Sequence, residues 1–240
     1  MTTRIATWNL ERAARPDRLA GELSRHHALH RTDVLLVQEI EHHAREATAR
    51  LDRLAQALAF PYIYYAQART WATGSHGLAV LARAPIVDPE IVPLPSPGVG
   101  RYNAPRIALA VTVGDLRIVN VHLDTRLDAD QRVVQLAPAI AAAARAPKAI
   151  LAGDFNTTPF RFWRNNLPIG AADQHAAVDA AAAARGLANA TRRLGPTTRR
   201  TLFAWRLDAI YTRGVEVEHA GIAREIRTSD HIPLWIDLTS

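Results

Sequence analysis

The chain of 240 residues is long enough to bury a substantial hydrophobic core, and its 48% hydrophobic and 22% charged residues are typical of an ordinary globular protein. It contains no cysteine, which excludes disulfides, thiol catalysis and cysteine-based metal sites. Its net charge of +6 is compatible with a polyanionic partner. However, Lys148 is the only lysine among the 29 basic residues, and such an arginine bias is typical of a GC-rich genome, which offers another explanation for the charge.

Short β-rich runs alternate with helical stretches along the chain, as hydrophobic periodicity indicates. In chain order we predict a strand at Arg4–Leu10, a helix at Asp17–His30, a strand at Asp33–Glu39, a helix at His42–Ala59, strands at Tyr62–Ala66, Gly77–Ala82, Ile107–Val113 and Arg117–Leu123, a helix at Ala129–Arg145, a strand at Ala149–Gly153, a helix at Ala171–Arg185, and strands at Arg206–Thr212, Val215–Gly221 and Pro233–Leu238. Two further segments, Pro93–Pro105 and Gly186–Arg200, are predicted to be surface loops.

Neither loop has the composition of a flexible linker, and the candidate polar residues extend from Asn9 to His231. We therefore expect residues 1–240 to form a single domain. The N-terminus lacks the apolar stretch of a signal peptide, and no later segment is apolar for long enough to span a bilayer. These features favour a cytoplasmic protein.

A polar residue at the end of an apolar strand is a pattern that recurs along the whole chain. The residues at or near such ends are Asn9, Glu11, Glu39, His122, Asp124, Asp154, Asn156, Asp208, Asp230 and His231. Each alone has a simpler explanation, because Asn and Asp often form turns and a single strand histidine is usually packed or hydrogen-bonded. Turn formation does not explain the repeated choice of Asn, Glu, His and Asp, so we interpret the set as a candidate site.

The segment Gly153-Asp154-Phe155-Asn156 follows the apolar run Ala149–Ala152. On extended backbone Asp154 and Asn156 point to the same face of the sheet, and Phe155 between them points into the core. Asp154 is then placed to act as a base toward a water molecule, with Asn156 orienting that water.

The other strand-end residues suit hydrolysis of a phosphate ester. Oxygen ligands from Asn9, Glu39 and Asp230 match a hard cation such as Mg²⁺ or Mn²⁺, which polarises a phosphoryl oxygen. Asp208 lies in an apolar strand, where a buried carboxylate needs a partner, and His231 can serve as that partner. The carboxylate would orient the imidazole and favour its protonated form.

Six motifs together resemble the endonuclease/exonuclease/phosphatase superfamily. They are Trp8-Asn9 with Glu11, Gln38-Glu39, Val121-His122-Leu123, Gly153-Asp154-Phe155-Asn156, Leu207-Asp208-Ala209-Ile210-Tyr211 and Ser229-Asp230-His231. They occur in that family's order and span nearly the whole chain. The resemblance implies a DNase I-like α/β fold, a four-layer α/β/β/α sandwich of two packed mixed β-sheets with helices outside and the active site at one edge.

The resemblance also implies a metal-dependent phosphoesterase that uses one or two Mg²⁺ or Mn²⁺ ions. By position, Glu39 is implied to be the main metal ligand, and Asn9, Glu11 and Asp230 assist it. The remaining motif residues are implied to be catalytic: Asp154 and Asn156 activate or orient the water, His231 with Asp208 supports the transition state, and His122 contacts the scissile phosphate.

Two arginines are candidates for substrate binding. Arg106 begins a strand and presents a forked donor that suits a phosphate, and Arg126 follows His122 beyond the strand end. A solvated or ion-paired surface arginine is the alternative for Arg106, whereas Arg126, like Asp124, could instead support the residues that contact the substrate. The arginines of the loop Gly186–Arg200 have the same two interpretations, contact with a polyanion or simple solvation.

The sequence departs from one branch of the family. Abasic-site DNA endonucleases usually have a Trp-rich segment before the motif that contains Asp208, and a tyrosine-type residue in the place of His122. This chain has only Phe203-Ala204-Trp205 and a histidine, which favours a compact phosphoesterase over a dedicated DNA-repair enzyme.

Three functions remain open at this level. The first is a nuclease that acts on a phosphodiester, with nucleic acid as the candidate substrate and without a membrane or an obligate protein partner. The second is a phosphatase or phosphodiesterase for a small molecule or lipid head group. The third is a non-catalytic binding module on the same scaffold. Such a module would lack a metal ligand or the His–Asp pair, whereas this sequence has the ligands and the pair.

Overall fold

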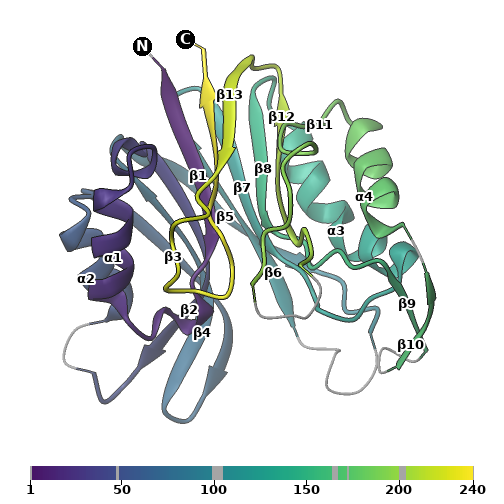
Figure 1. Ribbon diagram of the computed structural model, residues 1–240, viewed down its shortest axis with the longest axis horizontal. Coiled ribbons are helices and arrows are strands. Elements are labelled where there is room, and N and C mark those ends of the chain that lie inside the picture. The colour runs from purple at the N-terminus through teal and green to yellow at the C-terminus, as the bar shows by residue number, and fades with distance from the viewer. Residues whose placement is uncertain are drawn as a thin grey trace.

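Two six-stranded mixed β-sheets packed face to face form the centre of the molecule (Figure 1). The computed structural model describes residues 2–46, 49–98, 105–163, 167–171, 173–199 and 204–239. The first sheet contains, in spatial order, β13 (Val217–Ile222), β14 (Leu234–Leu238), β1 (Thr3–Asn9), β2 (Val34–His43), β4 (Gly74–Ala82) and β3 (Tyr62–Trp71). The second contains β11 (Ala188–Asn189), β12 (Asp208–Arg213), β8 (Ala149–Asp154), β7 (Leu116–His122), β6 (Arg106–Val113) and β5 (Ile86–Leu94).

Alternation of side chains along each strand separates three hydrophobic layers. On β1, Ile5 lies in the layer between the sheets, whereas Ala6 and Trp8 lie on the outer face of the first sheet. On β8, Ile150 likewise belongs to the central layer and Leu151 to the outer one. Both faces of each sheet are therefore covered, which explains the nearly continuous apolar runs in the sequence.

Helices cover the two outer faces. The first sheet is covered by α1 (Pro16–Arg25) and α2 (Arg50–Ala57), and the second by α3 (Ala129–Ala144) and α4 (Gln174–Ala183). Two short 3-10 helices, η1 (Glu11–Ala13) and η2 (Leu29–Arg31), flank α1. The predicted four-layer α/β/β/α sandwich is confirmed. Within the described residues, no helix is long and apolar enough to cross a membrane.

The structure corrects the prediction for His42–Ala59. Strand β2 continues to His43, because His42 and His43 pair with Ser75 and Gly74 of β4, and the helix covers only Arg50–Ala57. The helix predicted at Asp17–His30 is also divided, since His26 adopts an extended conformation between α1 and η2. At His42 and His43 strand pairing overrides a helical composition.

Four strands were absent from the prediction. Strand β5 contains two prolines, which an edge strand with a bulge between Val87 and Glu90 accommodates. The hairpin of β9 (Phe160–Trp163) and β10 (Leu167–Ala171) forms a separate two-stranded sheet. The two-residue β11 lies within the segment predicted as the loop Gly186–Arg200, and parts of both predicted loops, residues 99–104 and 200, lie outside the described residues.

Candidate active site

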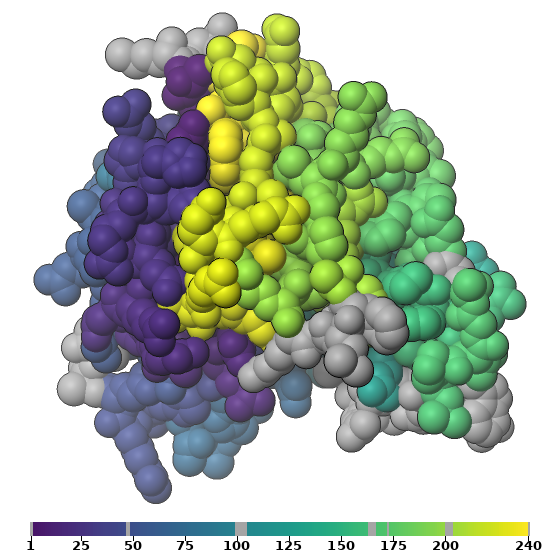
Figure 2. All heavy atoms as spheres, in the orientation of Figure 1, coloured from purple at the N-terminus to yellow at the C-terminus, as the bar shows by residue number. Residues whose placement is uncertain are grey.

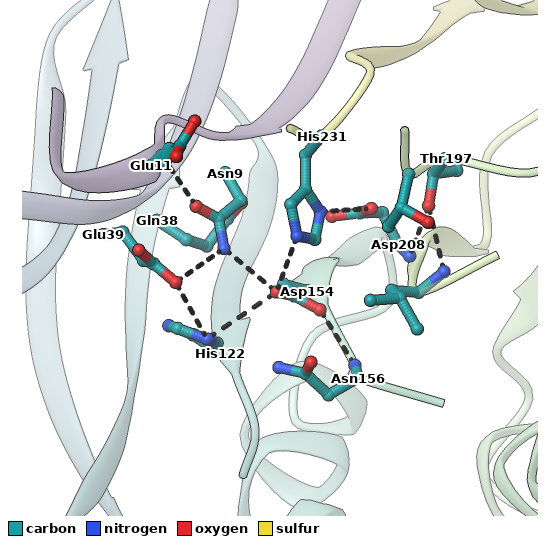
Figure 3. Close-up of polar contacts among 12 residues, drawn as sticks. Asn9, Glu11, Gln38, Glu39, His122, Asp154, Asn156, Thr197, Asp208 and His231 are labelled. Atoms are coloured by element: carbon teal, nitrogen blue, oxygen red, sulfur yellow. Dashed lines mark hydrogen bonds and ion pairs between the residues drawn. The ribbon is translucent and has the colours of Figure 1, made fainter. Parts of the chain in front are cut away.

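Polar residues of both sheets meet at one edge of the sandwich (Figure 3). Asn9 ends β1 and Glu39 lies within β2, both in the first sheet, whereas His122 ends β7 and Asp154 ends β8 in the second. Strands β1 and β2 are parallel, as are β7 and β8, so within each sheet the paired strands finish at the same edge. Four separate segments of the chain thus contribute to one site.

Asn9 connects the two sheets at this edge. Its amide nitrogen donates to Glu39 Oε1 at 3.2 Å and to Asp154 Oδ2 at 3.0 Å, and its amide oxygen accepts from the backbone N–H of Glu11 at 3.0 Å. In this orientation the nitrogen faces the carboxylates, so Asn9 holds them together as a donor. Ligation of a cation through its oxygen requires the opposite orientation of the amide.

A β-bulge determines the direction of Glu39. Along β2, Val37 and Ile40 both lie on the outer face, and the register with β4 shifts between them. Glu39 has a φ of 56°, in the left-handed region that non-glycine residues rarely adopt. Regular alternation would have turned Glu39 outward with Val37, whereas the inserted residue turns it toward Asn9.

A buried polar layer supports this bulge from the opposite sheet. Asn120 of β7 donates to the backbone carbonyls of Val37 and Ala79, both at 2.9 Å, and accepts from Gln38 Nε2 at 2.7 Å. Gln38 also donates to Thr7 Oγ1 at 3.0 Å. Asn120 and Gln38 are fully buried, so these hydrogen bonds fix the relative position of the two sheets below the site.

Asp154 and Asn156 form a tight turn, and the prediction that extended backbone aims both to one face is wrong. Asn156 has a φ of 50°, and its backbone N–H donates to Asp154 Oδ1 at 2.9 Å. Its side-chain nitrogen donates to the carbonyl of Leu123 at 2.9 Å. Phe155 packs in the outer core of the second sheet, as expected. The turn leaves Asp154 Oδ2 directed toward Asn9.

Asp208 and His231 form the predicted pair, with 2.8 Å between Asp208 Oδ2 and His231 Nδ1. Asp208 is directly opposite Asp154 in the antiparallel pairing of β12 with β8. Thr197 fixes this strand end, because its hydroxyl oxygen accepts the backbone N–H of Asp208 at 3.1 Å. His231 Nε2 then lies 3.7 Å from Asp154 Oδ2.

Burial and charge act in opposite directions on this group of residues. Burial by itself would lower the pKa of His231, but the charges of Asp208 and Asp154 outweigh it and raise the pKa. Burial raises the pKa of Asp154, and the charge of His231 only partly opposes this. The imidazole is therefore held protonated, and the Asp154 carboxylate is a stronger base than an exposed aspartate.

His122 is held in one tautomer. Arg106 Nη1 donates to His122 Nδ1 at 3.2 Å, so the ring proton lies on Nε2, which is 3.6 Å from Asp154 Oδ2 and 3.8 Å from Glu39 Oε1. Burial, followed by the charge of Arg106, lowers the pKa of His122 well below its usual value. The ring is therefore neutral, and its contacts with the carboxylates are polar contacts rather than ion pairs.

Arg106 is thus placed at the site, where its Nε also donates to the buried Asp124 at 2.8 Å. Arg126 is half-buried in the turn after β7, and its part in substrate binding stays a prediction. His76 of β4 was missed, although its ring centroid lies 6.1 Å from that of His122. Its position on the same face as Leu78 is the only signal in the sequence that could have indicated it.

A cavity of about 510 Å³ opens beside Glu39 and is lined by Leu10, Glu11, Arg12, Ala14, Arg15, Leu19, Glu39, Thr228 and Asp230. It brings together three of the four predicted metal ligands, all of them carboxylates, which is the donor set that Mg²⁺ and Mn²⁺ prefer. A second group, Asp154, Asp208 and His231, has ligand atoms within 4.8 Å of one another. In that group Asp208 and His231 already bind each other, so the carboxylates around the cavity fit a divalent cation better.

A family model described as the endonuclease/exonuclease/phosphatase family matches residues 6–231. The chain therefore belongs to this family, whose members are phosphoesterase hydrolases that depend on divalent metal ions. No curated protein matches the sequence.

Solved structures with the same fold include relatives of low sequence identity. An endonuclease/exonuclease/phosphatase from Beutenbergia cavernae is 23% identical, with a TM-score of 0.78 over 99% of this chain and 71% of that one. TDP2 from D. rerio, complexed with a single-strand DNA product, is 17% identical with a TM-score of 0.66 over 100% and 99% of the chains. A 3′ phosphatase, NExo, from Neisseria, bound to a product DNA hairpin, is 17% identical with a TM-score of 0.69 over 99% and 100%.

Proposed function

We propose that this chain is a nuclease that hydrolyses phosphodiester bonds by metal-assisted attack of water. The observation that carries the proposal is the convergence of three groups on one carboxylate oxygen. Asp154 Oδ2 lies 3.0 Å from Asn9 Nδ2, 3.6 Å from His122 Nε2 and 3.7 Å from His231 Nε2. These groups come from three separate segments of the chain, and in this proposal their donors would surround a phosphoryl group and a water at Asp154.

In this proposal Asp154 accepts a proton from the attacking water. Its burial supports the role, because a raised pKa improves a carboxylate as a base near neutral pH. Asn156, fixed by its hydrogen bond to Leu123, orients the same water. His231, kept protonated by Asp208, donates to a phosphoryl oxygen as negative charge develops there, and His122 donates its Nε2 proton to the same phosphate.

Glu39, Glu11 and Asp230 would hold one or two divalent cations, Mg²⁺ or Mn²⁺, with Asn9 beside Glu39 and Glu11. The bound cation would polarise a phosphoryl oxygen and offset charge in the transition state. Arg106 and Arg126 are proposed to bind the substrate, and Arg106 is supported by its contact with His122.

Two observations favour nucleic acid as the substrate. The chain has a formal net charge of +6, which attracts a polyanion, and two of its structural relatives are bound to DNA. A metal-supplemented activity screen tests the choice by comparing plasmid DNA, RNA, bis-p-nitrophenyl phosphate, and mono- and diester metabolites. We expect diester hydrolysis that requires Mg²⁺ or Mn²⁺ and is abolished by EDTA. Activity on monoesters alone would overturn the nuclease proposal in favour of a phosphatase.

A further inference from the structure

The cavity beside Glu39 contains two arginines that the proposed chemistry does not use. Arg12 and Arg15 line it together with the carboxylates of Glu11, Glu39 and Asp230. Figure 2 shows the N-terminal segment, in purple, against the C-terminal segment, in yellow, on this side of the molecule. Arg15 joins these segments, since its Nη2 donates to the carbonyl of Thr228 at 3.2 Å.

The cavity is larger than a metal centre requires. A cation with six water molecules around it occupies about 180 Å³, taking ~30 Å³ for each water. The cavity of about 510 Å³ leaves room for a further group, and its volume falls in the range of small-ligand pockets.

The charges around the cavity favour an anion as that group. The two guanidiniums and one divalent cation together exceed the charge of the three lining carboxylates. Arg12 forms only a weak ion pair, because its side chain is 70% exposed and its Nε lies 3.6 Å from Glu41 Oε1. Arginine binds phosphate well through its forked donors.

The backbone holds Arg12 in an unusual conformation at this place. Glu11, Arg12 and Ala13 are three consecutive non-glycine residues in the left-handed region, with φ values of 47°, 68° and 50°. Tertiary contacts enforce the turn: Arg50 Nη1 donates to the carbonyl of Arg12 at 2.8 Å, and the side chain of Ala13 is fully buried. Strain of this kind persists only where the surroundings impose it, and it concentrates at functional sites.

We infer that Arg12 and Arg15 form a second phosphate subsite, which binds a backbone phosphate next to the scissile one. The inference rests on the proposed nuclease function and adds a specific requirement to it. A substrate that uses this subsite is a strand with more than one phosphate, because the arginines bind a phosphate other than the one at Glu39.

The salt dependence of DNA binding tests this inference. The probe is a fluorescein-labelled single-stranded 12-nucleotide DNA, and binding is measured by anisotropy in an Asp154→Asn background, which keeps the DNA intact. Each lost phosphate contact reduces the slope of log K against log salt by ~0.7 for single strands. We expect Arg12→Gln and Arg15→Gln each to reduce the slope by about that amount. Arg18→Gln is the matched control, because Arg18 is an exposed arginine of α1 outside the cavity.

A second measurement does not depend on the Asp154→Asn background. In the otherwise unchanged protein, Arg12→Gln should reduce kcat/KM for the oligonucleotide by a larger factor than kcat/KM for bis-p-nitrophenyl phosphate. Equal slopes for the cavity variants and the Arg18→Gln control, or equal loss on both substrates, would overturn the subsite. A parent protein that hydrolyses bis-p-nitrophenyl phosphate but neither binds nor cleaves DNA would overturn both the subsite and the nuclease proposal.

Discussion

Asn120 offers the strongest test of how the site is assembled. It is fully buried, and its side chain crosses from the second sheet to the first, where it donates to the carbonyls of Val37 and Ala79 at the bulge that turns Glu39. Replacement by alanine leaves both carbonyls buried without these donors and removes the acceptor of Gln38 Nε2. The amide of Gln38 keeps its hydrogen bond to Thr7, so the cost comes from the three hydrogen bonds of Asn120 that are lost.

The expected loss follows from these groups. An intramolecular hydrogen bond contributes ~0.5–1.5 kcal/mol, so the loss of three in Asn120→Ala should reduce the free energy of unfolding by about 1.5–4.5 kcal/mol. That is a large part of the ~5–15 kcal/mol that stabilises a typical domain. Urea unfolding measures it as a lower midpoint with an unchanged m-value.

A double-mutant cycle separates the cross-sheet contact from the rest. Gln38→Ala and Asn120→Ala share a 2.7 Å hydrogen bond, so their effects should be non-additive by ~0.5–3 kcal/mol. A loss below about 1 kcal/mol for Asn120→Ala, or strict additivity in the cycle, would refute the view that this layer supports the bulge.

Three further predictions concern the site and its surroundings. If Asp154 is the base, Asp154→Ala should lower kcat by a factor of ~10²–10⁴. The control variant Asp52→Ala, on the exposed face of α2, should retain activity. Full metal-dependent hydrolysis by Asp154→Ala would contradict the mechanism. In metal-free protein, the raised pKa of His231 gives stability that is fully present below its usual pKa and lost as pH rises through the raised value. Asp208→Asn should therefore lower the pKa of His231, which NMR of the ring protons measures. An unchanged pKa would exclude the pairing with Asp208 as the cause of the raised value. Arg132→Met should reduce the free energy of unfolding, measured by urea unfolding, by roughly 3–5 kcal/mol. The reason is that the fully buried guanidinium donates to Gln174 and to three backbone carbonyls. A loss below ~1 kcal/mol would contradict this prediction.

Several features of the fold could be predicted because they are local. The alternation of Ile5 and Trp8 between two faces of β1 is readable from the sequence, and the structure confirms it. The prediction failed where pairing between distant segments decides the outcome. His42 and His43 have no strand signal of their own, and they are extended because β4 supplies the partner for their backbone. Strand β5 was missed because its prolines are tolerated only at a sheet edge.

The candidate site, like the fold, could be predicted only in part from the sequence. Its members could be chosen from the sequence, because an Asn, Glu, His or Asp after an apolar strand is a local pattern. Their directions could not, because the direction of a side chain depends on register with a neighbouring strand. Glu39 faces the site through a bulge, and Asn156 departs from extended backbone. His76 enters the neighbourhood of His122 only when the two sheets pack together.

The sequence by itself thus determined which groups are available: the acids, amides and histidines at strand ends, and the apolar runs that bury those strands on both faces. Tertiary structure alone decided how they act together. The pairing of β1 with β2 and of β7 with β8 brings the strand ends to one edge, and the packing of the two sheets sets Asn9 and His231 beside Asp154. The physical reason is that hydrogen bonding and charge interactions act over a few ångströms, whereas these residues lie far apart along the chain.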